Sequence, residues 1–303
     1  MANDTMTNRR LPEWLTIRLP KPDKIQQVEA MMRSARLHTV CESARCPNLP
    51  ECWSKGSATF MILGDVCTRA CGFCAIKTGK PLELDPQEPL RLAQAAKRMG
   101  LKHIVVTSVA RDDLPDGGAG QFAATIRALH ETIPYAIVEV LTPDFKGKAW
   151  CVRRVVDAQP EIFNHNVETV PRLHAIVRPQ ARYERSLRVL EMVKEMEPSV
   201  YTKSGIMLGL GETREEVIQV MRDLRSVGVD ALTIGQYLRP TARHLPVQEY
   251  LHPDVFREYQ QIGEEMGFLF VASGPFIRSS YNAIEFSRRV MAERLAKVGA
   301  VES

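Results

Sequence analysis

Three closely spaced cysteines form the pattern with the clearest chemical meaning in this sequence. Cys67, Cys71 and Cys74 have the spacing C-x3-C-x2-C, and Phe73 stands directly before the last of them. Three thiolates can bind three irons of a 4Fe-4S cubane, so the fourth iron can be chelated by the amino and carboxylate groups of a small molecule. A zinc site is the alternative, but structural zinc usually takes four protein ligands and favours paired C-x2-C knuckles. The spacing therefore favours a cubane with one open corner.

A second cysteine triad precedes the first one along the chain. Cys41, Cys46 and Cys52 have the spacing C-x4-C-x5-C, and Pro47 and Pro50 stiffen the segment that contains them. A fourth ligand for this triad must come from elsewhere in the chain. If both triads shared one metal site, two of the six sulfurs would be left over, whereas two clusters use all of them. Cysteines gathered in this way are typical of metal sites rather than of a disulfide framework in a reducing compartment.

The cysteine loops need a scaffold, and the sequence indicates alternating strands and helices. Short β-branched runs are each followed by a helix-like segment, which is the pattern of βαβ units that build a parallel sheet. The six predicted strands are Thr59–Leu63, His103–Val109, Ala136–Leu141, Ile162–Val167, Thr202–Leu208 and Ala231–Tyr237. A closed barrel needs eight such units. We therefore expect an α/β fold of the open, partial (β/α)6 barrel type, whose chemistry lies in loops at the carboxyl ends of the strands.

Three segments have the apolar periodicity of amphipathic helices. The clearest is Thr213–Gly228, where Thr213 and Glu216 form a T-x-x-E capping box. Ala181–Glu197 and Pro86–Met99 have similar patterns. These apolar stripes predict core-facing helices.

Other features are interpreted structurally. Cys151 falls within a helical pattern and is expected to be a small buried apolar residue. Asp112, Asp113 and Asp116 precede two glycines, where aspartate is favoured by turn geometry, so we assign them no catalysis. The seventh apolar run, Phe268–Ala272, leads into the C-terminal segment.

Length, composition and charge exclude several classes of protein. A chain of 303 residues suits one large domain with extensions, and 45% hydrophobic with 25% charged residues is ordinary for a globular protein. The net charge of +4 is not gathered into a long basic run, so no nucleic-acid partner is expected. Without a stretch of about 18 apolar residues or a secretion signal, we expect a cytoplasmic protein with no membrane partner. The first 36 residues lean basic, which suits either an acidic protein partner or a solvated arm.

Both triads, followed by Arg278-Ser279-Ser280-Tyr281 near the end, resemble the lipoyl synthase family of the radical S-adenosylmethionine superfamily. The resemblance extends from the N-terminal arm to about residue 290. It includes the segments 107–118, 164–169, 205–212 and 235–241. It implies an N-terminal extension with the auxiliary-cluster cysteines (1–55), a radical S-adenosylmethionine partial barrel (56–267) and a C-terminal extension with a serine cluster ligand (268–303).

The resemblance also implies roles for individual residues. Ser279 would complete the cluster of Cys41, Cys46 and Cys52, and its harder oxygen suits an iron that is to be lost easily. The cluster of Cys67, Cys71 and Cys74 would bind and cleave S-adenosylmethionine. Expected contacts to that cofactor are Thr107, Ser108, Asn166, Glu168 and Arg178. Without the resemblance, serines here favour a turn or helix cap, and Asn or Glu at a strand end favours a loop hydrogen bond.

The activity that the resemblance implies is radical-mediated insertion of two sulfur atoms at carbons six and eight of an octanoyl chain. That chain is attached to a lysine of a lipoyl carrier domain, as in 2-oxoacid dehydrogenase E2 subunits and the glycine cleavage H protein. The auxiliary 4Fe-4S cluster would be the sulfur donor, and a flavodoxin or ferredoxin would supply low-potential electrons.

Two rival functions remain at this level. A methylthiotransferase acting on tRNA would also carry two clusters, but it predicts a basic RNA-binding module that the sequence does not contain. An iron-sulfur electron carrier needs neither an open iron site nor a barrel of six units.

Overall fold

The computed structural model describes residues 11–16, 23–54, 58–280 and 286 of the 303-residue chain. Its centre is one eight-stranded sheet in the order β1-β2-β5-β6-β7-β8-β9-β10, with β1 and β10 at the two edges. The strands are β1 His38–Thr39, β2 Thr59–Ile62, β5 His103–Ser108, β6 Ile137–Leu141, β7 Ile162–Asn164, β8 Tyr201–Leu208, β9 Ala231–Gln236 and β10 Phe270–Gly274. β3 Val66–Cys67 and β4 Lys77–Thr78 form a separate parallel pair.

The sheet confirms the open, partial barrel expected from the sequence. All six predicted strands are present, with ends that differ by up to three residues, and they pair in parallel from β2 to β9. The predicted apolar run Phe268–Ala272 contains most of β10, which adds a further parallel strand beside β9. β1 pairs antiparallel with β2 at the other edge. Because the long strands are parallel, their carboxyl ends lie together at one end of the barrel.

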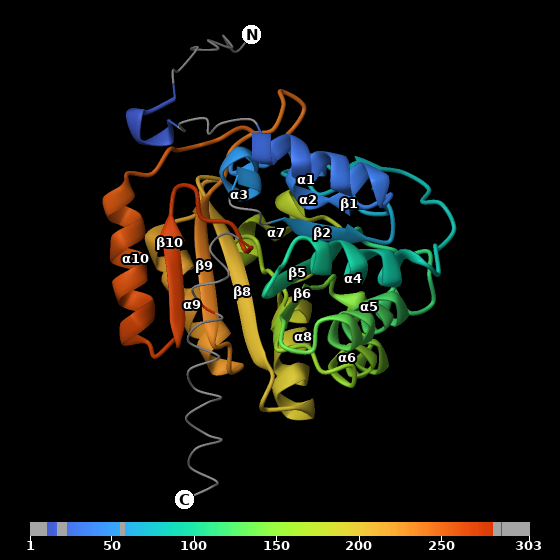
Figure 1. Ribbon diagram of the computed structural model, residues 1–303. Coiled ribbons are helices and arrows are strands. Elements are labelled where there is room, and N and C mark those ends of the chain that lie inside the picture. Colours follow the sequence, from blue (N-terminus) through green and yellow to red (C-terminus); the bar gives the residue numbers. More distant parts are fainter. Residues whose placement is uncertain (1–10, 17–22, 55–57, 281–285, 287–303) are drawn as a thin grey trace, which may run out of the picture.

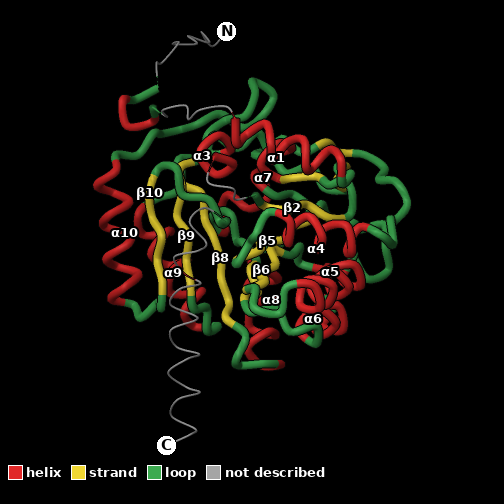
Figure 2. Tube along the Cα trace, in the orientation of Figure 1, coloured by secondary structure: helices red, strands yellow, loops and turns green. Residues whose placement is uncertain are grey.

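Helices cover the outer face of the sheet and one end of the barrel (Figures 1 and 2). The helices are α1 Asp23–Ser34, α2 Val40–Ser43, α3 Leu49–Ser54, α4 Glu88–Arg98, α5 Ala119–Thr132, α6 Ala149–Val156, α7 His174–Val177, α8 Tyr183–Met196, α9 Arg214–Ser226 and α10 Pro253–Glu265, with the 3-10 turns η1 Glu13–Leu15, η2 Phe145–Gly147 and η3 Pro171–Leu173. α4, α5, α6 and α8 pack against one another in chain order, and α10 packs on β10 and β9. α1, α2 and α3 lie across the top of the barrel in Figure 1.

Local sequence signals explain several helix boundaries. The Thr213 hydroxyl accepts from the Glu216 backbone N–H and the Glu216 carboxylate accepts from Thr213 N–H, so the predicted capping box starts α9. Gly228 follows that helix with a φ of +79°, a conformation that glycine adopts without strain. Cys151 is fully buried in α6, as predicted. Residues 1–10 and 17–22 of the basic N-terminal arm and Tyr281 lie outside the described residues.

The barrel interior contains a buried ionic network. The Lys203 ammonium of β8 donates to Glu139 Oε1 of β6 at 2.8 Å, and Asn164 Nδ2 donates to the same oxygen at 3.0 Å. His103 Nε2 lies 3.2 Å from Glu139 Oε2. Burial alone would raise the pKa of Glu139, but Lys203 and His103 together hold it at about 2. The network therefore ties β5, β6, β7 and β8 together below the carboxyl ends of the strands.

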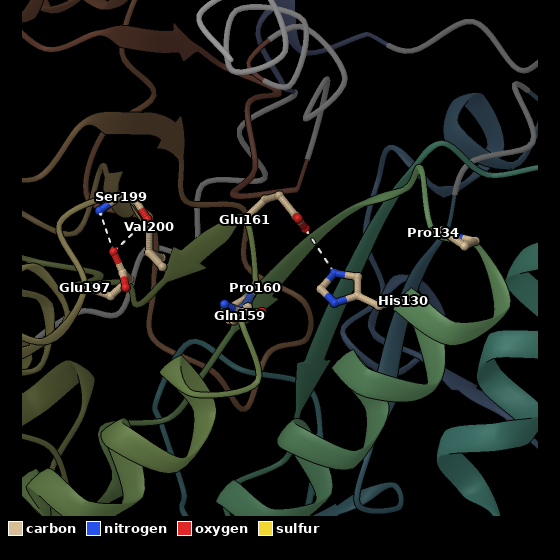
Figure 3. Close-up of a pocket in the computed structure, with 8 residues that line it drawn as sticks. All are labelled: His130, Pro134, Gln159, Pro160, Glu161, Glu197, Ser199 and Val200. Carbon is tan, nitrogen blue, oxygen red and sulfur yellow. Dashed lines mark hydrogen bonds and ion pairs between the residues drawn. The ribbon is translucent and has the colours of Figure 1, made fainter. Parts of the chain in front are cut away.

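A hollow of about 300 Å³ lies near the amino ends of β7 and β8 (Figure 3). His130 faces Glu161 across it, with Nε2 3.4 Å from Oε2. Its lining residues are His130, Pro134, Gln159, Pro160, Glu161, Glu197, Ser199 and Val200. They include no cysteine, so this hollow is separate from the chemistry that the sequence predicts. In the part of the chain that the structure describes, no helix is long and apolar enough to cross a membrane.

We predict that Lys203→Met lowers the free energy of unfolding by about 3 kcal/mol, because it leaves the Glu139 carboxylate buried without its ammonium partner. Urea denaturation followed by circular dichroism measures this loss. The pKa of Glu139 is about 2 in the fold and 4.5 ordinarily, so the contribution of the charged carboxylate is complete above pH 4.5 and is lost as the pH falls toward 2. The deficit of the variant should shrink over that range.

The matched control for this prediction is Arg214→Met. Arg214 pairs with Glu258 on the surface, where both side chains are about half exposed, so the change should stay within about 0.5 kcal/mol. Equal losses in the two variants would contradict a special role for the buried pair.

Candidate active site

The second cysteine triad along the chain lies on the loop that runs from β3 to β4. Cys67 ends β3, and its Sγ accepts hydrogen bonds from Arg69 N at 3.4 Å and Ala110 N at 3.3 Å. The backbone N–H and the hydroxyl of Thr68 both donate to Ala110 O, at 3.0 and 2.9 Å. These bonds fasten the start of the loop to the segment that follows the carboxyl end of β5.

The buried guanidinium of Arg69 also anchors this loop. Arg69 Nε and Nη2 donate to the two carboxylate oxygens of Asp112 at 2.7 and 2.9 Å, and Nη2 also donates to Asp144 Oδ1 at 2.6 Å. The other oxygen of Asp144 accepts from Arg185 at 3.1 Å. Burial would raise the pKa of Asp144, but the Arg69 charge holds it well below its usual range. The loop is thus anchored to segments after β5 and β6 by charge-assisted bonds.

The far side of the loop packs against the end of α7 and the segment after β9. Gly72 N donates to Val177 O at 2.9 Å, and Gly72 O accepts from Leu245 N at 3.0 Å. A Cβ at Gly72 would lie 2.9 Å from the Leu245 side chain, so the close approach favours glycine. His244 Nε2 lies 3.1 Å from Cys74 O. The loop is therefore held at both ends and in the middle before any metal binds.

Polar side chains that follow β7 and α7 lie near this loop. Asn166 Nδ2 donates to Glu168 Oε1 at 3.1 Å, and Arg178 Nη1 donates to Asn166 O at 2.8 Å. Glu168 has a φ of +68°, which is rare for a residue other than glycine and marks a constrained position. Burial raises the pKa of Glu168, and the Arg178 charge opposes this rise. The same Glu168 and Arg178 act electrostatically on Cys71, so all three groups share one site.

The cysteines of this loop are half-buried. Burial raises the pKa of Cys71, which the charge of Arg178 partly offsets, and burial raises the pKa of Cys74 to about 12. Since iron binds the thiolate, metal binding must displace these protons and supply the positive charge that the protein does not.

The first triad along the chain lies in and between α2 and α3: Cys41 in α2, Cys46 between the two helices and Cys52 in α3. Cys41 is buried in α2, where burial raises its pKa, and the neighbouring Cys46 raises it further. Two backbone hydrogen bonds hold the segment together: Cys46 N donates to Cys41 O at 2.9 Å, and Cys52 N donates to Asn48 O at 2.9 Å. Asn48 is the link to the C-terminal segment, because its Nδ2 donates to Phe276 O at 2.6 Å.

Ser279 lies next to Asn166, which follows the carboxyl end of β7. Its Oγ accepts from Asn166 Nδ2 at 3.2 Å, which places it beside the strand-end groups just described. The preceding Arg278 is half-buried; desolvation lowers its pKa, and the neighbouring Cys46 raises it. The tertiary structure therefore brings residues 278 and 279 to the same end of the barrel as both cysteine triads.

The donor set fits two 4Fe-4S clusters and S-adenosylmethionine. Within the described residues, no three His, Cys, Asp or Glu side chains are arranged around one point to hold a single metal ion. A cubane holds each of three thiolates on a separate iron. Buried polar atoms without a partner in this described part include Ser108 Oγ, Asn166 Oδ1 and Arg178 Nε, which suits a polar cofactor beside the cysteine loop.

The predicted contact residues differ in how available they are. Thr107 donates through its hydroxyl to Leu141 O at 3.1 Å, so part of its bonding capacity serves the sheet. Ser108, Asn166 and Glu168 lie at or just beyond strand ends on the cysteine side, and Arg178 follows α7 and donates to Asn166 O. These five residues remain a predicted set.

Sequence reasoning missed the residues that hold the loops. Arg69, Asp144 and Asn48 carried no pattern, since their partners lie far away in the sequence. Asp112 was interpreted as a turn residue, whereas here it also accepts two bonds from Arg69. The one signal in the sequence that could have indicated this anchor was the position of a charged residue, Arg69, between Cys67 and Cys71. By contrast, Asp116 accepts from Gly118 N and Gly120 N, which fits the turn interpretation.

Comparison with solved structures supports the architecture. SuiB from Streptococcus suis, solved with bound S-adenosylmethionine, matches 74% of this chain and 54% of its own, with a TM-score of 0.57 at 15% identity. Methylornithine synthase (PylB) matches 84% of this chain and 80% of its own, with a TM-score of 0.53 at 12% identity. At these identities the likeness establishes the fold alone.

Comparison with family profiles identifies the protein class, the radical SAM superfamily. The profile of the radical SAM superfamily matches residues 61–224, which include the C-x3-C-x2-C loop and the strands β5 to β8. The profile for the N-terminal domain of lipoyl synthase matches residues 2–46.

Full-length relatives then narrow the assignment. The lipoyl synthase of Rubrobacter xylanophilus is 60% identical over 90% of this chain and 85% of its own, and that of Thermus thermophilus is 55% identical over 93% and 88%. The chain belongs to the lipoyl synthase family.

We predict that Arg69→Met disrupts the cysteine loop, because it removes the guanidinium that joins Asp112 to the buried Asp144. Reductive cleavage of S-adenosylmethionine by the reconstituted variant should fall about a hundredfold, the effect of a displacement on the order of 1 Å at a reacting centre. Chromatographic measurement of 5′-deoxyadenosine checks this.

The control is Lys77→Met, on β4 at the end of the same loop. Lys77 pairs with Asp65 on the surface with 77% of its side chain exposed, so its loss should change the rate less than about twofold. A similar loss in both variants would show that the clamp is not the cause.

Proposed function

We propose that this chain inserts two sulfur atoms, at carbons six and eight, into an octanoyl chain attached to a lysine of a lipoyl carrier domain. The observation that carries the proposal is the juxtaposition of three elements at one barrel end: the loop of Cys67, Cys71 and Cys74, the α2–α3 region of the other triad, and Ser279. Family membership supports the same reaction.

In this proposal the two cysteine triads hold different clusters. Cys67, Cys71 and Cys74 hold the 4Fe-4S cluster that has an open iron, and Cys41, Cys46, Cys52 and Ser279 hold the auxiliary 4Fe-4S cluster. When bound, the first cluster with S-adenosylmethionine supplies a radical able to take hydrogen from an unactivated carbon, and the second supplies sulfur.

The protein's own residues orient the cofactor and keep water out. The Arg178 guanidinium is buried next to Cys71 and has an unpartnered Nε, so it suits a carboxylate such as that of the methionyl group. Asn166 and Glu168 suit the ribose hydroxyls, because together they offer an acceptor and an amide at one strand end. Thr107 and Ser108 line the end of β5 as further polar contacts.

Asn166 contacts both halves of the proposed site. Its amide donates to Glu168 on the cofactor side and to Ser279 on the auxiliary side. The Asn166 side chain thus lies between the cofactor side and the sulfur source. This position suits the reaction, because the carbon radical formed on the substrate has to react with a cluster sulfur before it reacts with any other group.

The proposed partners follow from the reaction. The substrate is an octanoylated carrier domain, such as a 2-oxoacid dehydrogenase E2 subunit or the glycine cleavage H protein. Electrons for each cleavage come from a low-potential carrier such as a flavodoxin or ferredoxin.

The test separates radical generation from sulfur insertion. We predict that Cys41→Ala retains formation of 5′-deoxyadenosine but yields no lipoyl product from an octanoyl-lysyl peptide, whereas Cys71→Ala loses both. Mass spectrometry of the peptide and chromatography of 5′-deoxyadenosine measure the two outcomes under anaerobic conditions.

Cys151→Ala serves as the matched cysteine control. It removes a thiol that is fully buried in α6, so both products should form. Full lipoyl product from the Cys41→Ala variant would overturn the proposed role of the auxiliary cluster.

A further inference from the structure

Trp53 has a buried indole N–H group without a regular hydrogen bond. The residue lies in α3 directly after Cys52, and only 2% of it is exposed. Among the described residues, its Nε1 has no partner at hydrogen-bond geometry. A buried donor whose bond is not made is costly, so such a group in a folded protein calls for an explanation. The other two tryptophans, Trp14 and Trp150, are 37% and 51% exposed and can meet water.

Two ligands of the proposed auxiliary cluster lie in the surroundings of Trp53. α3 packs against α1 near α2 (Figure 1). Trp53 belongs to a core cluster of apolar side chains that also contains the buried Cys41 and has Cys52 packed against it. Sulfur is the only kind of hydrogen-bond acceptor that the side chains of this core cluster offer. An acceptor for the indole N–H is therefore to be sought among the cysteines.

Cys41 is the cysteine on which the Trp53 N–H acts. Burial raises the pKa of Cys41, and the backbone of Thr59 and the side chain of Trp53 oppose this rise as hydrogen-bond donors. A protonated thiol is a weak acceptor. A thiolate bound to iron carries charge, which makes hydrogen bonds to it shorter and stronger. The Trp53 N–H therefore has a suitable acceptor when Cys41 binds iron.

We propose that Trp53 is a positioning residue for the auxiliary cluster: its indole N–H donates to the Cys41 sulfur and thereby raises the reduction potential of that cluster. The inference rests on the proposed function, because it needs a cluster at Cys41. Hydrogen bonds to the cluster sulfurs are among the factors that set a reduction potential. One-electron reduction adds negative charge to the cluster, and an N–H donor stabilises that charge.

The experiment isolates the auxiliary cluster in the full-length chain. In a parent variant with Cys67, Cys71 and Cys74 changed to Ala, only the auxiliary cluster can be reconstituted. Its midpoint potential is measured by anaerobic titration with dithionite, followed by electron paramagnetic resonance. Trp53→Phe and Trp53→Leu should both shift this potential to more negative values by a similar amount, because both lack the N–H group. An indole that only fills space predicts an unchanged potential in Trp53→Phe and a change in Trp53→Leu alone.

A second measurement detects the hydrogen bond without any change at position 53. The parent is labelled with tryptophan that carries nitrogen-15 in the indole ring, and its reduced cluster is examined by electron spin echo envelope modulation. The parent and its Trp150→Phe variant should both show a nitrogen-15 nucleus coupled to the cluster. Trp53→Phe should lose this coupling.

Phe122→Leu in the same parent is the matched control for lost aromatic packing. Phe122 is fully buried in the same core cluster as Trp53, but it lies in α5 and packs on Phe145. The change should lower stability and leave the potential of the auxiliary cluster unchanged. A shift as large as that of Trp53→Leu would assign the effect to loosened packing and overturn the role of the N–H group.

The outcomes distinguish the two proposals. If Trp53→Phe keeps the potential of the parent, or if the labelled parent shows no coupled nitrogen-15, the role of Trp53 is overturned and the proposed function stands. If the parent itself holds no cluster, both are overturned. If neither variant at position 53 folds, the labelled parent alone decides.

Discussion

The arrangement of the site depends on one buried interaction, the contact of the Arg69 guanidinium with Asp112 and Asp144. Asp144 is fully buried, so its charge is tolerated only because Arg69 and Arg185 both reach it. Arg69 lies between two of the cysteines, and each carboxylate follows a different strand. A loop that has to present thiols to a metal cannot be stabilised by packing those thiols away. This ion pair network stabilises the loop through Arg69, which leaves the thiols free of that task.

The open barrel imposes a second constraint, because an unclosed sheet leaves an interior that has to be filled. Different layers of that interior are filled in different ways. The layer at the amino end is apolar and contains Phe286 with the first residues of β6 to β10. Glu139, Lys203, His103 and Asn164 make the next layer ionic, and the Lys203 charge keeps Glu139 ionised despite complete burial. At the carboxyl end the lining is polar with unpartnered atoms, as a cofactor site requires. This order of layers separates the part of the interior that stabilises the fold from the part that is suited to bind a cofactor.

The electrostatics of the two triads also have a common cause. In both, burial raises the pKa of a cysteine, Cys41 in one and Cys74 in the other, so the protein by itself favours thiols over thiolates. Iron then has to provide the charge that ionises them, which couples cluster binding to loss of protons. Arg178, next to Cys71, is a cation that partly offsets this cost. The Ser279 oxygen would be a harder ligand than the three cysteine sulfurs. It would therefore bind its iron less well, which fits an iron that leaves the cluster first.

Much of this protein could be predicted from local sequence. The spacing of Cys67, Cys71 and Cys74 predicts a cubane with an open corner, since the number and order of thiols are covalent facts of the chain. The β-branched runs predicted six strands correctly, because parallel strands buried on both faces are continuously apolar. The capping box of Thr213 and Glu216 predicted the start of α9, because both partners lie within one helical turn.

Only the tertiary structure decided what holds the site together. Arg69 meets Asp144 across 75 residues, and Asn48 meets Phe276 across 228, so no local pattern marks either pair. Phe286 looks like any apolar residue in the sequence, and its position becomes visible only when the starts of five strands surround it. The physical reason is the same in each case. Propensity and ligand spacing act over a few neighbouring residues, whereas burial, desolvation and long-range ion pairs exist only once the sheet has brought distant segments together.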